Sequence, residues 1–262
     1  MLSTPDDIRV HSLAQFALGQ DWRLLLAHDR PYHLLVWITR GQGRVLLDGM
    51  RRGIGAHNAL FIPAGTIFAL DLGRQSIGQV VVLPVATPLR LPEIPRHLRI
   101  RDVQTQTELT NLIEAAGREE QGKRPLRGDA LEAHAALMSV WLRRQIMQED
   151  HIPERRNAAG RLSQRFCKLL AQRFRSGDTM ADYAKALGVT PTHLTRAVKA
   201  ATGKTASDLL TERVVYEARR LLMETKEPAQ QIAAYLGFGS AAYFTRFIQH
   251  HTGTAPSKLR GR

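Results

Sequence analysis

The chain has 262 residues, of which 44% are hydrophobic, and its 37 Lys+Arg against 24 Asp+Glu give a formal net charge of +13. This length and apolar content suit one large folded domain or two of ordinary size, and they argue against a disordered chain. There is no run of 18 apolar residues, and the start, MLSTPDDIRVHS, lacks the basic and apolar stretches of a signal peptide, so we expect a cytoplasmic protein that does not enter a membrane.

The positive charge is concentrated in the C-terminal part of the chain. Residues 157–262 contain 17 Lys+Arg against 7 Asp+Glu, a net charge of +10, whereas residues 1–156 contain 20 against 17, a net charge of +3. A basic surface favours a polyanionic partner, because binding to phosphates releases condensed counterions. The alternative is a solvated basic face without a partner.

Residues 31–85 have the pattern of short β-strands. The apolar runs HLLVWIT, RVLLD, ALFIPAG and QVVVLP are separated by glycine-containing segments such as GQG and DG. Several short strands at close spacing predict a small barrel or sandwich. Four prolines between residues 84 and 95 then interrupt regular structure.

From Val103 onward the apolar spacing becomes helical. An apolar stripe recurs at steps of three, four and seven and consists of Leu131, Met138, Leu142 and Ile146. Two interpretations remain open: the stripe packs against the strands, or it forms the seam of a homodimer. The polar segment HIPERRNAAG that follows is typical of a linker between domains.

A repeat appears when residues 179–209 are laid over residues 228–259. In the first copy, ADYAKALGVTPTHLTRAVKAATG, Gly188 ends one predicted helix because glycine adopts a left-handed conformation without steric penalty. Thr190 can cap the next helix, whose first position is Pro191. Leu194 and Val198 lie four residues apart on this second helix and face the protein core.

The second copy, QIAAYLGFGSAAYFTRFIQHHTG, has the same parts. Gly237 ends its first helix, Ser240 caps the second, and Phe244 and Ile248 face the core. Helix, glycine turn and helix with a polar basic face is the geometry that sets a recognition helix into the DNA major groove. Two copies within a segment of net charge +10 indicate DNA binding far more strongly than one copy does. A long connecting helix is predicted for the segment between them, ASDLLTERVVYEARRLLMET.

These residues resemble the AraC/XylS family of bacterial transcription regulators over about residues 160–260. The signature positions run from Ile232 to Ser257 and are Ile232, Gly237, Phe238, Tyr243, Phe244, Phe247, Thr252, Gly253, Pro256 and Ser257. The resemblance implies an α+β multidomain chain. Its parts are a cupin-like β-barrel sensor domain (1–100), a helical dimerisation and linker region (101–155) and a DNA-binding domain (156–262), with helix-turn-helix units at about 179–200 and 228–251.

The resemblance also implies that one monomer places two recognition helices in successive turns of double-stranded DNA and often activates transcription by recruiting RNA polymerase. The DNA-binding positions are then Thr190, Thr192, Thr195, Arg196 and Lys199 in the first unit, and Ser240, Ala241, Ala242, Thr245 and Arg246 in the second. Ala241 and Ala242 are shorter than the side chains of many relatives, so the second unit is expected to read few bases. Arg246 can contact a base, a phosphate or an intramolecular carboxylate.

The N-terminal half resembles the cupin-like sensor domains of this family, in the order GQGRVLLDG, FIPAG and two short strands. Metal-binding cupins carry an HxH pattern and a histidine after PxGxx, but this chain has no HxH, and Phe68 stands at the second place. We therefore predict no metal and no cofactor. A small-molecule effector cavity touched by some of His33, Trp37, Arg44, Phe61 and Phe68 is the alternative to these aromatic residues being core.

No catalytic pattern stands out, because the chain lacks GxSxG and GxxxxGK[ST] and its carboxylates are scattered. The single cysteine, Cys167, is expected to be a buried core thiol. The sequence thus predicts a transcription regulator that is not an enzyme, responds to an effector and forms a homodimer. The alternatives are a metal-dependent cupin enzyme with a helical appendage and an architectural DNA binder without sequence preference.

Overall fold

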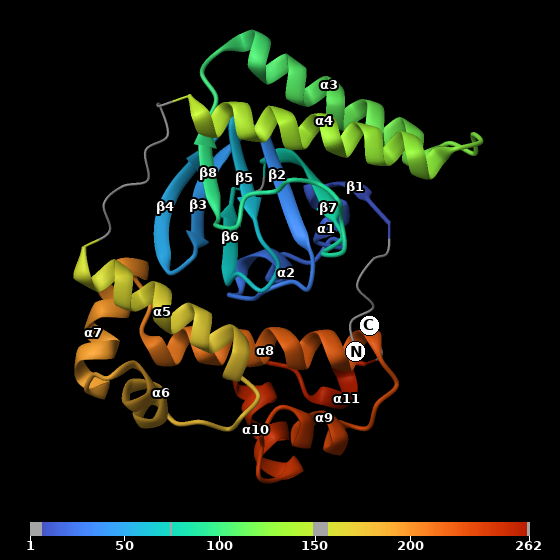
Figure 1. Cartoon of the computed structure of the whole chain (residues 1–262). Helices are drawn as coiled ribbons and strands as arrows, with labels where there is room; N and C mark the ends of the chain where they lie inside the picture. The colour runs from blue at the N-terminus through green and yellow to red at the C-terminus, as the bar shows by residue number, and fades with distance from the viewer. Residues whose placement is uncertain (1–6, 74, 149–156, 261–262) are drawn as a thin grey trace.

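The computed structural model describes residues 7–73, 75–148 and 157–260 (Figure 1). A β region comes first, a pair of long helices covers one side of it, and a wholly helical region follows on the opposite side. The expected α+β arrangement is confirmed. The linker expected at residues 151–160 lies outside the described residues as far as residue 156.

The β region consists of two antiparallel sheets. The strands are β1 (Arg9–Ser12), β2 (His33–Arg40), β3 (Gln42–Leu47), β4 (Met50–Gly55), β5 (Asn58–Ile62), β6 (Phe68–Leu72), β7 (Ile77–Leu83) and β8 (Arg96–Arg99), with the short helices α1 (Leu13–Phe16) and α2 (Trp22–Leu25) between β1 and β2. Five strands pair in the order β1-β7-β2-β5-β8 and three in the order β4-β3-β6. Among the described strands, no ladder joins the two sheets into a closed barrel.

Alternating residues of β2 serve two different cores, as strand geometry requires. Leu34, Val36 and Ile38 pack between the two sheets against residues such as Leu47 and Phe68. Leu35 and Trp37 point to the opposite face of the five-stranded sheet and pack under the long helices. Because both faces are covered, the central strand reads as a continuous apolar run.

The long helices α3 (Val103–Gln121) and α4 (Arg127–Met147) form the hairpin that covers this sheet (Figure 1). Leu131, Met138 and Leu142 are each 3% exposed or less and belong to the core beneath α4, and Ile146 packs against it. The stripe therefore packs against the strands within one chain. A dimer seam formed by Leu131, Met138 and Leu142 is wrong, because these side chains are covered within the chain, whereas Ile146 is half-buried.

The C-terminal region is built from seven helices in its described part. They are α5 (Ala158–Arg173), α6 (Met180–Leu187), α7 (Pro191–Thr202), α8 (Ala206–Glu224), α9 (Ala229–Tyr235), α10 (Ala241–Thr252) and α11 (Pro256–Leu259). Their shared core contains Cys167, which is 2% exposed, as expected for a core thiol. Within the described residues, no helix has the length and apolarity to span a membrane.

The β region is docked on α8, which runs beneath it in Figure 1. Arg213 Nε donates to Asp29 Oδ1 at 2.6 Å, and Arg23 Nη1 lies 2.6 Å from Glu224 Oε1. Tyr216 of α8 stacks on His28 with ring centroids 4.1 Å apart and ring planes 5° from parallel. Ala27, Leu46, Ile67 and Ala69 of the β region share one apolar core with the C-terminal helices. The two halves of the chain are thus joined by both polar and apolar contacts.

A buried ionic ladder on α8 supports this docking. Glu217 accepts hydrogen bonds from Arg213 at 3.1 Å and from Arg220 at 2.7 Å, and all three residues are buried. Burial raises the pKa of the Glu217 carboxyl, but the hydrogen bonds and positive charges of the two arginines outweigh it and leave the pKa below its ordinary value. Removing one partner would leave a buried charge unpaired, which is strongly destabilising.

His28 is the buried titratable group of this interface. It is 0% exposed, its Nδ1 lies 2.8 Å from the Leu26 carbonyl oxygen, and Arg30, Arg213 and Arg23 surround it. Burial first, and then the positive charge of Arg30, hold the pKa of His28 well below its ordinary value. The imidazole is therefore neutral in the folded protein at neutral pH.

We expect Met138→Ala to lower the free energy of unfolding by about 2–5 kcal/mol, because it removes a buried side chain beneath α4 and leaves a cavity. Leu137→Ala is the matched control, since Leu137 is 53% exposed on the other side of the same helix turn and surface changes lie within about 0.5 kcal/mol. Urea unfolding measures both. A larger loss for Leu137→Ala would contradict the packing of the stripe against the sheet.

We expect the stability to fall as the pH drops from 7.5 to 5.5, because the unfolded chain takes up a proton on His28 that the folded chain excludes. At one pH unit below the unfolded pKa this difference is worth about 1.4 kcal/mol. His28→Gln should remove that part of the pH dependence in urea unfolding, while His33→Gln, whose group is half-buried with a pKa lowered by burial, serves as comparison. An unchanged pH dependence in His28→Gln would show that His28 is charged in the folded state.

Candidate nucleic-acid interface

The first helix-turn-helix unit joins α6 to α7 through a turn that requires glycine. Gly188 has a φ of 71°, in the left-handed region that side chains disfavour. The Thr190 hydroxyl accepts a hydrogen bond from the backbone N–H of His193 at 3.2 Å, and Pro191 occupies the first helical position, where no N–H is needed. The turn and the cap are as the sequence predicts.

The second unit joins α9 to α10 in the same way. Gly237 has a φ of 78°, and a Cβ atom at this position would lie 2.7 Å from the backbone oxygen of Arg175, so glycine is required twice over. The Ser240 hydroxyl accepts a hydrogen bond from the backbone N–H of Tyr243 at 3.2 Å. One additional residue, Gly239, lengthens this turn, which explains why the repeat offset grows from 49 before the turn to 50 after it.

The two recognition helices also end alike. Thr202 Oγ1 donates to the Val198 carbonyl at 2.8 Å and accepts from the Lys204 N–H at 3.1 Å. Fifty residues on, Thr252 Oγ1 donates to the Ile248 carbonyl at 2.8 Å and accepts from the backbone N–H two residues later at 3.2 Å. The repeat seen in the sequence is therefore a repeat of hydrogen bonds as well as of residue types.

The predicted DNA-binding residues lie on the solvent side of α7 and α10 or at their first turns. Exposed are Thr190, Thr192, Arg196, Lys199, Ser240, Ala242 and Arg246, and half-buried are Thr195, Ala241 and Thr245. On the opposite sides, Leu194 and Val198 of α7 and Phe244 and Ile248 of α10 are all 0% exposed. Each helix is thus anchored by two apolar residues and presents its polar face outward.

Three of the predicted contact residues have hydroxyls that are already engaged. Thr190 and Ser240 accept from the backbone of their own helices as caps, and Thr245 Oγ1 donates to the Ala241 carbonyl at 2.9 Å. A capping oxygen is directed at its helix, so these residues are suited first to fixing where the recognition helix begins.

The structure adds exposed positions that the sequence argument did not name. They are His193 and Ala200 on α7 and Tyr243, Gln249 and His250 on α10. Positions 193 and 200 correspond to positions 243 and 250 at the offset of 50, and Gln249 corresponds to Lys199. The repeat could have identified them. A position in one copy that matches a predicted contact residue in the other copy, or a neighbour of that residue on the same helical face, belongs to the same surface.

The basic side chains of the C-terminal region fall into two groups. Arg213, Arg220, Lys204 and Arg173 form ion pairs within the chain. In contrast, Arg196, Lys199 and Arg246 make no ion pair within the described residues and project from the two recognition helices. The intramolecular ion pair considered for Arg246 is therefore not formed here. Free guanidinium and ammonium groups on these faces can bind phosphates or the edges of bases.

Two aspartates of this region are held at helix starts. The side-chain hydrogen bond from Thr179 lowers the pKa of Asp182 in the first turn of α6, and the one from Thr205 does the same for Asp208 in α8. Each aspartate accepts from the backbone N–H of its threonine, at 2.9 Å and 2.8 Å. These charges are thus tied to the N-termini of the two supporting helices, where they favour helix formation.

Only some of the five residues considered for an effector cavity lie together: Trp37 and Phe61 share one core, and His33 stacks on Phe61 with ring centroids 5.9 Å apart. Trp37 and Phe61 are 0% exposed in the core under α3 and α4, where Trp37 Nε1 donates to Thr110 Oγ1 at 3.1 Å. Phe68 is 0% exposed between the two sheets, on the other face of the five-stranded sheet. Phe68 therefore cannot line one cavity together with Trp37 and Phe61, because they lie on opposite faces of the sheet.

The two polar members of that set, His33 and Arg44, lie in different places. His33 Nδ1 accepts from the backbone N–H of Ala64 at 3.2 Å, and burial lowers the pKa of this half-buried imidazole. Arg44 lines an open hollow at the end of the sheets together with Arg99, Asp71 and four glycines. Among the described residues, no three His, Cys, Asp or Glu side chains are grouped so that they could hold a metal ion.

Part of the chain matches known proteins in sequence. A family model described as a helix-turn-helix domain matches residues 183–262. The chain is also 35% identical over 83 residues to a protein described as a probable transcription factor, PqrA, of Proteus vulgaris; the match covers 32% of this chain and 66% of that protein, just under two thirds of its length.

Among solved structures, the C-terminal domain of AraT, a response regulator from Geobacillus stearothermophilus, is 26% identical over 40% of this chain and 88% of its own, with a TM-score of 0.38. A structure of ToxT from Vibrio cholerae, described as bound to an unsaturated fatty acid, is 13% identical and covers 99% of this chain and 97% of its own, with a TM-score of 0.45.

The family model begins at Tyr183 in α6 and runs through both turns, both recognition helices and α11. It thus covers the part of the chain in which the capped turns, the buried anchors and the free basic side chains were found. The C-terminal region therefore contains a domain that matches the helix-turn-helix family model over residues 183–262.

Proposed function

We propose that the protein is a sequence-specific transcription regulator that binds promoter or operator DNA with α7 and α10 in two neighbouring major-groove segments. The observation that carries this proposal is the pair of matching helices, each anchored by two fully buried apolar residues and each exposing an arginine free of ion pairs at the same place, Arg196 and Arg246. A recognition helix needs this combination of a fixed back and a free polar face.

The two units are expected to contribute differently. In α7 the outward face carries Thr192, Arg196 and Lys199, which offer a hydroxyl and two cations for hydrogen bonds. In α10, Ala241 and Ala242 stand where such groups would be, so Arg246 is the main cation of that face. An arginine can donate twice to guanine and discriminate by about 1–3 kcal/mol. We infer that the first unit supplies most of the base recognition and the second mainly grips the DNA backbone.

The remaining parts of the proposal follow from the family resemblance. They are activation of transcription through contact with RNA polymerase, control by a small-molecule effector, and a homodimer in solution. The dimer has to use a surface other than the stripe from Leu131 to Ile146, since that stripe is covered by the sheet. The effector site cannot combine Phe68 with Trp37 and Phe61, since the sheet divides them.

The test begins with selection of bound fragments from a genomic library by the purified protein. On the selected site, we expect Arg196→Ala to reduce the affinity by about 1–3 kcal/mol and to relax the preference at one base pair, as the loss of a guanine contact does. Arg246→Ala should weaken binding to selected and unrelated duplexes by similar factors and reduce the slope of log K against log salt by about one. Quantitative binding assays at several salt concentrations measure both variants.

Arg118→Ala is the control for loss of a positive charge, because Arg118 is exposed on α3, away from the helix-turn-helix units. It should leave the affinity for the selected site unchanged. Equal binding of all fragments would instead favour the architectural DNA binder, and a loss in Arg118→Ala as large as that in Arg196→Ala would contradict the assignment of the interface.

A further inference from the structure

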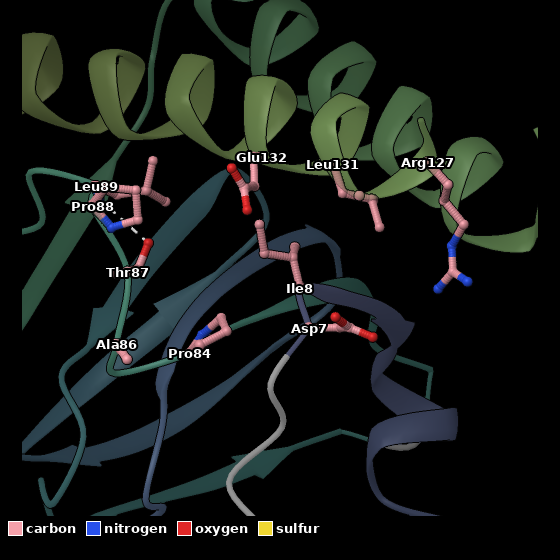
Figure 2. A pocket seen from close by; sticks show the side chains of 11 residues that line it. Asp7, Ile8, Pro84, Ala86, Thr87, Pro88, Leu89, Arg127, Leu131 and Glu132 are labelled. Carbon is pink, nitrogen blue, oxygen red and sulfur yellow. Dashed lines mark hydrogen bonds between the residues drawn. The ribbon is translucent and has the colours of Figure 1, made fainter. Parts of the chain in front are cut away.

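A cavity lies where the start of β1, the loop after β7 and the first turns of α4 meet. Figure 2 shows its lining, in which Arg127, Leu131 and Glu132 come from α4 and the other side chains from the two β-region segments. Its volume is about 260 Å³. Pockets for drug-sized ligands usually measure roughly 300–1,000 Å³, so this one suits a smaller metabolite.

The body of the cavity is apolar. Ile8 and Leu131 are 6% and 3% exposed, and Pro84 is buried beside the half-buried Leu89. Ile8 and Leu131 belong to the core beneath α3 and α4 and Leu89 packs against it, so the floor is fixed by the fold and not by a loop alone. An apolar group of a ligand would be held against a preformed surface here.

The rim carries both signs of charge. Arg127 stands on one side of Leu131 and Glu132 on the other, and Asp7 lies below Arg127 in Figure 2. None of these three side chains forms an ion pair with any of the described residues. The Arg127 Nε atom is buried and has no hydrogen-bond partner in the part of the chain that the structure describes. Because Arg127 has no carboxylate partner among the described residues, its guanidinium group can meet a ligand that carries an acceptor.

The backbone adds to the positive end of the site. Helix α4 has 21 residues and begins after Leu126, which has a φ of 59° and gives no side-chain cap. The backbone N–H groups of the first turn, including that of Gly128 in the cavity lining, are therefore not taken by a cap. Together with Arg127 they favour a carboxylate at this end, whereas Asp7 and Glu132 favour a cation.

We propose that this cavity binds a small zwitterion with an apolar body, of the class of free α-amino acids with an apolar side chain. The carboxylate meets Arg127 and the first turn of α4, the ammonium group meets Asp7 and Glu132, and the apolar side chain lies on Ile8 and Leu131. A simple anion would face two carboxylates, and a simple cation would leave Arg127 unsatisfied. The role of this site in regulation rests on the proposed function, but ligand binding itself does not.

The test is calorimetric titration and thermal shift of the full chain without DNA, with L-phenylalanine and L-leucine as probes. Two analogues of phenylalanine separate the charges: hydrocinnamate lacks the ammonium group and phenethylamine lacks the carboxylate. We expect both amino acids to bind and to raise the melting temperature, and each analogue to bind about tenfold more weakly or worse than phenylalanine.

Variants then assign the ends of the ligand. Arg127→Gln should weaken phenylalanine binding about tenfold, so that phenylalanine no longer binds more tightly than phenethylamine. Glu132→Gln should reduce the difference in affinity between phenylalanine and hydrocinnamate. Arg44→Gln is the matched control, because Arg44 lines the separate hollow at the end of the sheets, and it should change nothing. The melting curves without ligand verify that each variant is folded.

Three results would overturn the proposal: no binding of either amino acid at millimolar concentrations, equal binding of phenylalanine and its two analogues, or as large a loss in Arg44→Gln as in Arg127→Gln. Because no DNA is present, a failure here is distinct from a failure of the proposed DNA binding. A protein that binds phenylalanine but no specific DNA would retain the site and lose only its regulatory role.

Discussion

The burial of α8 on several sides at once is the constraint on which the rest of the structure depends. Leu209, Ala218 and Leu222 of this helix are 0% exposed in the core shared by both helix-turn-helix units, and the side of α8 that carries Tyr216 is covered by the β region. Arg213 links the two sides, since it pairs with Asp29 of the β region and with Glu217 of its own helix. Movement of α8 relative to either neighbour would separate buried charges, so both recognition helices are positioned from one element that the β region also holds.

The DNA-binding half could be predicted in detail because local rules and tertiary structure agree there. The left-handed glycines, the threonine and serine caps and the pairs of apolar anchors are each specified within a few residues, and the repeat states every feature twice. The additional residue Gly239 was visible only as a change of the repeat offset. The repeat does not predict which basic side chains lack an ion pair, because the partners of Arg213 and Arg173 come from other segments of the chain.

The N-terminal half was harder to predict because its strands are buried on both faces. Alternation normally separates core from surface, but in β2 both sets of residues are apolar, and the sequence cannot say that Trp37 faces α3 while Val36 faces the other sheet. For the same reason the sequence could not decide whether the apolar stripe on α4 forms a dimer seam or packs in the core. The cavity beside Arg127 brings together residues from positions 7, 84–89 and 127–132, so no local pattern could have indicated it.

A single chain of this protein is expected to present two recognition faces to one stretch of DNA. Hydroxyl-radical footprinting of the protein on a site selected from genomic fragments tests it most directly. The account predicts two protected boxes about one helical turn, or roughly 10 base pairs, apart, with Arg196→Ala weakening one box first and Arg246→Ala the other. Two outcomes would contradict this geometry. One is protection of a single box that one of the two substitutions leaves unchanged, and the other is uniform protection without a preferred site.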